Sequence, residues 1–379
     1  MPWRSDPTPA SCVSPQCFRD YSSCPMRIPL LVALAPALAI IACTRATVTT
    51  GASTTIVPAE PGEGHLANIR QLTFGGNNAE SYFSHSGKQL IFQRQEKSDS
   101  ACDQEYIMNV DGSGMRRISN GMGRTTCGFF YSSDSRVLYS STFKHSPECP
   151  PPLDRSHGYV WPIGFLEIYT SKPDGSDLRQ LTSNGAYNAE ATLSWDGKRI
   201  IFTSTRDGDI DLYTMNTDGT DVRRITSRIG YDGGAWFSPD GKQIVWRAAY
   251  PVTAADSADY LNLLHNHMVR PSKVEVWVAN ADGSNPRQVT HLGGANFAPV
   301  FTPDGKKIIF SSNYENPRSG AFDLFLINPD GTGLEKVTTH PEFDSFPMFS
   351  YDGKKLVWAS NRNATRPGDT NLFIADWVN

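Results

Sequence analysis

A short motif that recurs six times constrains this chain more than any other feature. Each copy places long polar side chains, mostly arginine, lysine or glutamine, before an aliphatic residue and a final Thr or Ser. The copies are residues 69–73, 115–119, 178–182, 223–226, 286–290 and 334–338. A unit this short cannot bury its apolar face alone, so its repetition predicts a fold of stacked, similar modules.

A second motif, a turn of the Asp-Gly-Lys type, occurs once in each unit. Asp-Gly favours a tight two-residue hairpin, because both central residues accept positive φ. Each turn is followed by a β-branched or aromatic run and then by a third strand. In five units another Asp-Gly turn comes before the next basic motif. Ser135 takes the place of the glycine in the second unit. The turns are residues 86–88, 134–136, 196–198, 240–242, 304–306 and 352–354.

Each unit is therefore four short antiparallel strands joined by tight turns. Gly197 and Gly241 lie 44 residues apart, the period of a propeller blade. The sixth unit ends at Asn379 after its third strand, while a spare fourth strand stands at 69–73. We expect that strand to complete the last blade, because closure removes two exposed sheet edges. The predicted fold is an all-β, six-bladed β-propeller over residues 66–379.

The most regular copies carry a family resemblance. Residues 237–242 read Phe-Ser-Pro-Asp-Gly-Lys, and residues 201–208 and 211–213 of the preceding unit complete the pattern. These segments resemble TolB-family propeller repeats. The resemblance implies a scaffold that works in complexes of the bacterial envelope. TolB has an additional N-terminal α/β domain, which we expect to be missing here, so partners specific to that domain are not carried over.

The N-terminal residues have the pattern of a targeting segment. We interpret residues 1–42 as an extension and a lipoprotein signal peptide, with translation starting at Met26, because Met26-Arg27 opens an apolar run over 28–42. Ala42-Cys43 resembles the end of a lipobox, which implies acylation of Cys43. An ordinary cleaved signal and an uncleaved anchor are the alternatives. Residues 43–65 are rich in Thr, Ser, Pro and Gly, and predict a flexible tether.

These features predict that the protein is located in the periplasm or cell envelope, with a lipid anchor as its only membrane contact. Thr44 follows the lipid cysteine, and the resemblance to lipoproteins without Asp at that position implies the outer membrane. The net charge of −4 does not favour binding to nucleic acid, which would require a basic face. We expect a monomer.

Two insertions mark one face of the predicted propeller as the working face. They cover about residues 142–165 in blade 2 and 248–273 in blade 4, and 257–269 is expected to be helical. Both follow second strands, so they leave the face opposite the Asp-Gly turns, which we expect to be inert. Long loops on a rigid scaffold often carry function. The alternative is drift in loop length without function.

A ring of polar residues is predicted at the channel rim, nine positions before each turn glycine or Ser135. Glu80 and Glu190 follow two positions after ring members. Their oxygens would suit a divalent cation such as calcium, or a polar ligand; no other cofactor is expected. The alternative is that Asn and Asp merely bond local backbone. The ring is Asn78, Thr126, Asn188, Asp232, Asn296 and Asp344.

Three cysteines, Cys102, Cys127 and Cys149, follow the signal segment. An oxidising compartment favours a disulfide. We expect Cys127 to pair with Cys149, because both belong to blade 2. The alternatives are a Cys102–Cys127 bond and buried free thiols.

The sequence favours a non-catalytic module that binds an envelope protein, peptide or glycan. It has no Gly-x-Ser-x-Gly elbow, no His-Glu-x-x-His and no phosphate loop. A polysaccharide hydrolase or lyase is the alternative, and an accessory subunit of a separate peptidase is a third hypothesis. The residues of an enzymatic site would be His145, His157, Glu80, Glu190 and Asp232.

Overall fold

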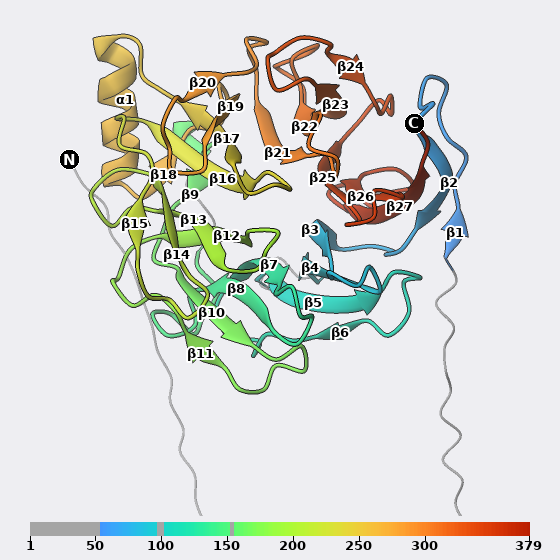
Figure 1. The fold of residues 1–379 in the computed structure, drawn as a ribbon, viewed down its shortest axis with the longest axis horizontal. Helices are drawn as coiled ribbons and strands as arrows, with labels where there is room; N and C mark the ends of the chain where they lie inside the picture. Colours follow the sequence, from blue (N-terminus) through green and yellow to red (C-terminus); the bar gives the residue numbers. More distant parts are fainter. Residues whose placement is uncertain (1–53, 97–101, 152–154) are drawn as a thin grey trace, which may run out of the picture. The chain divides into compact units, whose positions relative to one another are not determined.

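The computed structural model describes residues 54–96, 102–151 and 155–379, which form a six-bladed β-propeller (Figure 1). Blades 1 to 5 each contain four antiparallel strands in sequence order. Blade 1 has β3 (Asn77–Phe83), β4 (Gln89–Gln95), β5 (Gln104–Asn109) and β6 (Arg116–Arg117). Blade 2 has β7 (Thr125–Phe130), β8 (Val137–Ser141), β10 (Glu167–Ser171) and β11 (Arg179–Gln180). Blade 3 has β12 (Asn188–Leu193), β13 (Arg199–Ser204), β14 (Asp211–Asn216) and β15 (Arg223–Arg224). Blade 4 has β16 (Tyr231–Phe237), β17 (Gln243–Ala249), β19 (Glu275–Asn280) and β20 (Arg287–Gln288). Blade 5 has β21 (Asn296–Phe301), β22 (Ile308–Ser312), β23 (Asp323–Ile327) and β24 (Glu335–Lys336).

Blade 6 joins the two ends of the propeller and confirms the predicted closure. It contains β25 (Asp344–Phe349), β26 (Lys355–Ser360) and β27 (Asn371–Trp377), followed by β2 (Leu66–Gln71) from the N-terminal side. β2 runs antiparallel to β27, with Leu66 opposite Trp377 and Gln71 opposite Phe373. A further strand that the sequence analysis does not predict, β1 (Thr55–Ile56), pairs with the outer edge of β2.

The residues just before β2 are packed against the propeller, which corrects part of the predicted tether. Glu63 is buried, and its carboxylate pairs with the guanidinium of Arg362, with 2.8 Å between Oε2 and Nη1. Arg362 also bonds Asp344 of β25, with 2.9 Å between Nη2 and Oδ2. The prediction of a flexible segment is therefore wrong for residues 54–65. Residues 1–53, including the predicted signal segment and Cys43, lie outside the described residues.

The centre of the propeller is filled by side chains. Tyr82, Phe129 and Trp236, from the innermost strands of blades 1, 2 and 4, have ring centroids 5.1 to 5.8 Å apart. Such tilted and edge-to-face contacts are favourable for aromatic rings. The three rings divide the channel into a part near the insertions and a part near the Asp-Gly turns.

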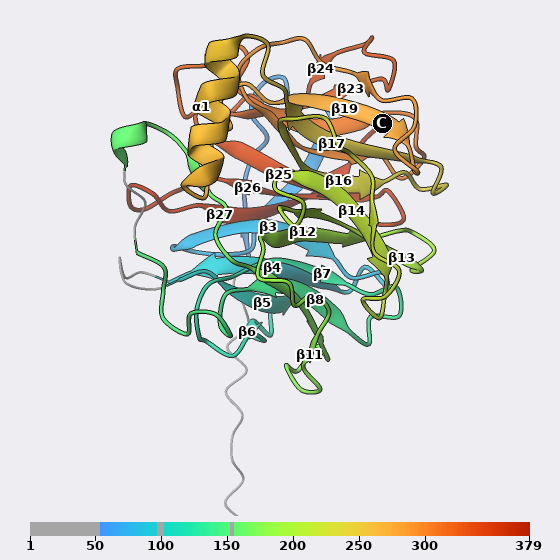
Figure 2. The ribbon, with the colours of Figure 1, turned by 90° about the vertical axis from the view of Figure 1, so that its left-hand side faces the viewer.

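The two insertions leave the same face and pair with each other. In Figure 2, helix α1 (Ala254–His265) and the 3-10 helix η1 (Arg155–His157) lie on one side of the blades. β9 (Trp161–Pro162) of the blade 2 insertion pairs with β18 (Met268–Val269) of the blade 4 insertion. We call this two-stranded ribbon the strap. Within the described part of the chain, no helix is long and apolar enough to cross a membrane.

The helix is shifted relative to the predicted 257–269. It begins earlier because Thr253 and Asp256 form a capping box that satisfies two N-terminal amides. It ends at His265, and Met268 belongs to the strap instead. Its buried residues are Tyr260 and Leu263, whereas Leu261 faces solvent.

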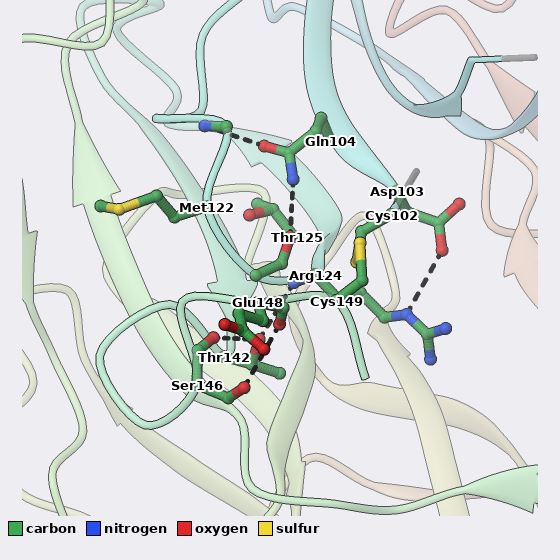
Figure 3. The surroundings of a disulfide bond; sticks show 12 residues. Cys102, Asp103, Gln104, Met122, Arg124, Thr125, Thr142, Ser146, Glu148 and Cys149 are labelled. Carbon is green, nitrogen blue, oxygen red and sulfur yellow. Dashed lines mark hydrogen bonds and ion pairs between the residues drawn. A yellow bond between two sulfur atoms is a disulfide. The ribbon is translucent and has the colours of Figure 1, made fainter. Parts of the chain in front are cut away.

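The disulfide joins Cys102 to Cys149 (Figure 3). Cys127 is a buried free thiol. The predicted Cys127–Cys149 pair is therefore wrong, and so is the Cys102–Cys127 alternative. Cys102 lies just before β5, at the face from which the blade 2 insertion leaves, so it reaches Cys149. Cys127 belongs to the innermost strand β7 and lines the channel.

Candidate functional site

The predicted polar ring is buried between blades instead of lining the channel rim. Its side chains bond neighbouring segments: the Nδ2 atoms of Asn78 and Asn296 donate to the carbonyls of Thr370 (2.8 Å) and Val274 (3.1 Å). Asn188 likewise donates to the backbone of the preceding blade, and Asp232 and Asp344 accept hydrogen bonds from buried tryptophans. The contacts of the three asparagines join successive blades, whereas the tryptophan contacts of Asp232 and Asp344 stay within one blade. All five side chains are buried, so the placement predicted from sequence is wrong; they are Asn78, Asn188, Asp232, Asn296 and Asp344.

Thr126 is not the sixth member of that set. Asp134, with φ of 56°, adopts the conformation that glycine has in the other turns, and its amide donates to Tyr131 as the amide of Gly87 donates to Ser84. The second unit is therefore offset by one residue, and Thr125 is the equivalent position. Aspartate tolerates this left-handed conformation better than most residues.

A cavity with a volume of about 30 Å³ lies in the channel on the insertion side of the aromatic rings and opens to solvent. β-bulges on all six innermost strands turn side chains toward it. Glu80 and Glu190 occupy the bulges of blades 1 and 3, with φ of 51° and 57°. The lining residues are Glu80, Tyr82, Cys127, Glu190, Ala191, Thr192, Gly234, Trp236, Arg247, Ala298 and Phe346.

Arg247 enters the cavity from the second strand of blade 4. Its guanidinium pairs with Glu190, and its Nε donates to the hydroxyl of Tyr231 (2.9 Å). Gly234, with φ of 60°, makes room for it, because a Cβ there would collide with the guanidinium. Glu190 also accepts from Thr203 (2.8 Å) and from the backbone amide of Gly234 (2.9 Å).

Glu80 has a different environment from Glu190. Burial raises its pKa to about 7, the negative charge of Glu190 adds to this effect, and Arg247 partly opposes it. Burial also raises the pKa of the neighbouring Cys127 thiol. Near neutral pH the cavity thus holds one carboxylate in an ion pair and one carboxyl group that readily gains or loses a proton.

Glu105 lies behind the wall of this cavity. Its Oε1 accepts from the amide of Gly128 (3.1 Å), and its buried Oε2 has no hydrogen-bond partner among the described residues. Burial, and then the charge of Glu80, raise its pKa well above the usual range. The backbone amide of Glu105 donates to the hydroxyl of Ser119, and in each of the other five blades the amide of an aliphatic residue donates to a Thr hydroxyl in the same way. Those residues are Ile168, Leu212, Val276, Leu324 and Leu372.

The two histidines of the predicted enzymatic site lie elsewhere. His145 is exposed and packs against Phe165, with ring centroids 4.5 Å apart. His157 is also exposed, and its carbonyl accepts from Arg270 (2.9 Å). Neither lines the cavity. In residues 54–96, 102–151 and 155–379, no three His, Cys, Asp or Glu side chains come together as they would around a metal ion.

The strap lies beside the cavity, and the insertion segments outside the strap expose apolar side chains. Trp161 packs 5.1 Å from the guanidinium carbon of Arg247. Farther out, exposed apolar side chains belong to both insertions, among them Val252, which is 90% exposed, and Leu261, which is 51% exposed. We call Tyr159, Phe165, Val252 and Leu261 the insertion patch.

Sequence reasoning missed Arg247, Glu105 and Trp161. Arg247 and Glu105 each break a repeat position, and an alignment of the second and third strands, in addition to the turns, would have exposed both. Trp161 had no comparable signal, because it stands in an insertion that has no counterpart in other blades.

The fold and its repeats define a six-bladed propeller whose closed channel carries a small polar cavity at one end. The family model described as TolB beta propeller domain matches residues 162–256 and 262–374, more than half of the chain. The protein therefore belongs to the TolB beta propeller domain family.

A curated relative, the protein TolB homolog of Chlorobium luteolum, is 25% identical over 162 residues. That match covers 42% of this chain and 32% of the relative, so the chain spans about a third of that protein's length.

Two solved structures illustrate the fold. The putative TolB of Agrobacterium tumefaciens has a TM-score of 0.53 at 18% identity, covering 80% of this chain and 91% of that one. A gluconolactonase of Xanthomonas campestris has a TM-score of 0.54 at 14% identity, covering 86% and 94%. At these identities the likeness shows the fold alone, and the fold serves both kinds of protein.

Proposed function

We propose that the protein is a non-catalytic binding scaffold that docks a partner protein on the face carrying the blade 2 and blade 4 insertions. The observation that carries this proposal is the strap, which joins two long insertions into one surface element. Arg270 reinforces it by contacting both Asp259 of α1 (3.1 Å) and the carbonyl of His157 (2.9 Å). Two loops tied in this way form a surface that needs little ordering on binding.

The insertion patch supports a protein partner over a glycan. Tyr159, Phe165, Val252 and Leu261 expose apolar surface, and apolar and aromatic side chains dominate the centres of protein interfaces. Several exposed apolar residues on the other face, such as Met115, Leu178, Val222 and Leu334, instead occupy one repeated position before the fourth strand. The architecture of the repeat explains why these residues are exposed, whereas it does not explain the exposure of the insertion patch.

Paired substitutions test the docking face. A Val252→Asp/Leu261→Asp variant is expected to lose partner retention in pull-downs from envelope extracts, because it places two charges in the interface. Leu178→Asp/Val222→Asp is the matched control, since those side chains are 41% and 40% exposed on the other side. Equal retention by both variants, or loss only in the control, would contradict the proposal.

The proposed location is the bacterial cell envelope, where a lipid on Cys43 would anchor the protein in the outer membrane. The support is the signal pattern over residues 26–43 and the membership of the TolB beta propeller domain family. Cys43→Ser is expected to move the protein from the membrane fraction to the soluble envelope fraction and to abolish labelling by a palmitate analogue. Unchanged labelling in that variant would exclude the anchor.

A further inference from the structure

The blades differ from one another at the bulge position that faces the cavity. The bulge position carries Glu80, Cys127, Glu190, Gly234, Ala298 and Phe346 in blades 1 to 6. Blades 5 and 6 form the same bulge with Ala298 and Phe346, so the bulge itself requires no carboxyl group. Glu80 and Glu190 are therefore not explained by the architecture of the repeat.

The two carboxyl groups are not equally available. Glu190 is held by Arg247, Thr203 and the amide of Gly234. No ion pair among the described residues includes Glu80, although its side chain lines the cavity. Behind the wall, the unpartnered Oε2 of Glu105 adds a second buried acidic group that no cation of the described chain neutralises. Arg247 lines the same cavity, but its ion pair is with Glu190.

The walls restrict what kind of cation would fit. The aromatic rings of Tyr82, Trp236 and Phe346 line the same cavity as Glu80. A hard metal ion needs six to eight oxygen ligands, which one free carboxylate does not provide. An organic ammonium needs one carboxylate for a charge-assisted hydrogen bond and gains from aromatic faces near its charge.

We propose that this cavity binds a primary alkylammonium group, with Glu80 as its counter-ion and Tyr82, Trp236 and Phe346 as its apolar walls. The cavity volume of about 30 Å³ leaves room only for the ammonium end of the ligand, whose alkyl chain extends toward the open mouth. Arg247 fixes Glu190 and so leaves Glu80 as the single recognition group. The site is separate from the insertion patch and does not depend on the docking of a protein there.

Binding should depend on pH, because Glu80 must be ionised to pair with an ammonium. Its pKa is raised to about 7, so affinity is expected to increase between pH 6 and pH 8. The groups that face it are Glu190, Arg247, Cys127 and Asp103, together with Glu105 behind. An alkylammonium has a pKa well above this range and stays charged throughout.

Isothermal titration calorimetry of the whole protein with n-butylammonium chloride tests the proposal. At pH 8 and constant ionic strength we expect saturable binding that Glu80→Gln weakens by about tenfold or more. The matched control is Glu148→Gln, because that side chain is exposed on the blade 2 insertion and lies outside the cavity. n-Butanol and potassium chloride serve as neutral and metal-ion probes, and neither should compete.

A second variant keeps the test decisive if Glu80→Gln does not fold. Ala298→Phe introduces at blade 5 the residue that blade 6 already has at the same bulge, where φ is 51° and 56° in the two blades. Its ring would fill the cavity and is expected to abolish butylammonium binding. The proposal is wrong if the wild type binds no butylammonium, if n-butanol or potassium binds equally well, or if either folded variant binds like the wild type.

Discussion

Single residues that break the repeat carry most of the information about this protein. Glu105 is buried where five other blades have an aliphatic side chain, and Arg247 enters the channel only because Gly234 leaves room. The repeated positions themselves, such as Asn78 and Asn296, bond between blades and serve the architecture. Residues that depart from the pattern are therefore the better candidates for function.

The pKa of Glu105 makes a prediction about stability. Because burial raises that pKa in the folded state, ionisation destabilises the fold at high pH, and this effect disappears as pH falls toward the pKa of the unfolded chain. Glu105→Gln keeps the acceptor for Gly128 but cannot ionise. We expect it to raise the free energy of unfolding at pH 8 by on the order of 1 kcal/mol or more.

Urea denaturation of Glu105→Gln and the wild type at pH 8 and pH 5 checks this expectation. The gain should shrink at pH 5, because a smaller fraction of the unfolded wild-type chain is ionised at this position as pH approaches its unfolded pKa. Glu148→Gln is the control, since its side chain is exposed. A gain that does not change between pH 8 and pH 5 would show that ionisation of Glu105 is not its cause.

Elements outside the regular blades position the loop-bearing face. The strap pairs the two insertions, and the Cys102–Cys149 disulfide fastens the blade 2 insertion to the start of β5 in blade 1 (Figure 3). Beside that bond, Arg124 and Asp103 form an ion pair at 3.5 Å. The insertion on blade 2 is thus tied to blades 1 and 4 on either side.

The disulfide gives a prediction at this scale. Cys149→Ser is expected to reduce the free energy of unfolding by about 2–4 kcal/mol, because the bond closes a loop between residues 47 apart. Peptide mapping under non-reducing conditions should recover one linked pair that contains Cys102 and Cys149. Recovery of a peptide linked through Cys127 would contradict the assignment.

The sequence reveals the elements of the blades better than the elements between them. Turns and strands recur six times, so an error in one copy is corrected by the others. One error remained: Asp134 takes the position of the turn glycine in blade 2, so the ring position there was assigned to Thr126 instead of Thr125. The insertions occur once each. A single copy does not show that Trp161 lies opposite Val269, or that Cys102 reaches Cys149, because these contacts depend on how the blades are placed in space.

At the scale of the whole molecule, the N-terminal strand closes the ring. β2 buries Leu66 and Ile69 against blade 6, and Glu63 adds a buried ion pair with Arg362. The closure was readable from sequence because one strand was missing at one end and present at the other. The ion pair was not, because Glu63 stands in a segment that reads as a polar tether.

Truncation tests this closure. A chain that begins at Phe74 is expected to lose about 5 kcal/mol or more of stability, since each buried aliphatic side chain contributes roughly 1.5–3 kcal/mol. A chain that begins at Val57 loses β1, whose Ile56 is exposed, but keeps Val57 against the core, and should change by less than about 1 kcal/mol. Thermal melts that fall equally for the two truncations would contradict the assigned role of β2.

The central claim is that the insertion-bearing face receives a partner protein, and site-specific photo-crosslinking in living cells tests it most directly. A benzophenone side chain at Val252 or Leu261 is expected to give a discrete crosslinked adduct with one partner protein. The same group at Leu178 or Val222, on the other side of the propeller, should give none. Adducts from Leu178 and Val222 without adducts from Val252 and Leu261 would contradict the assignment of the working face.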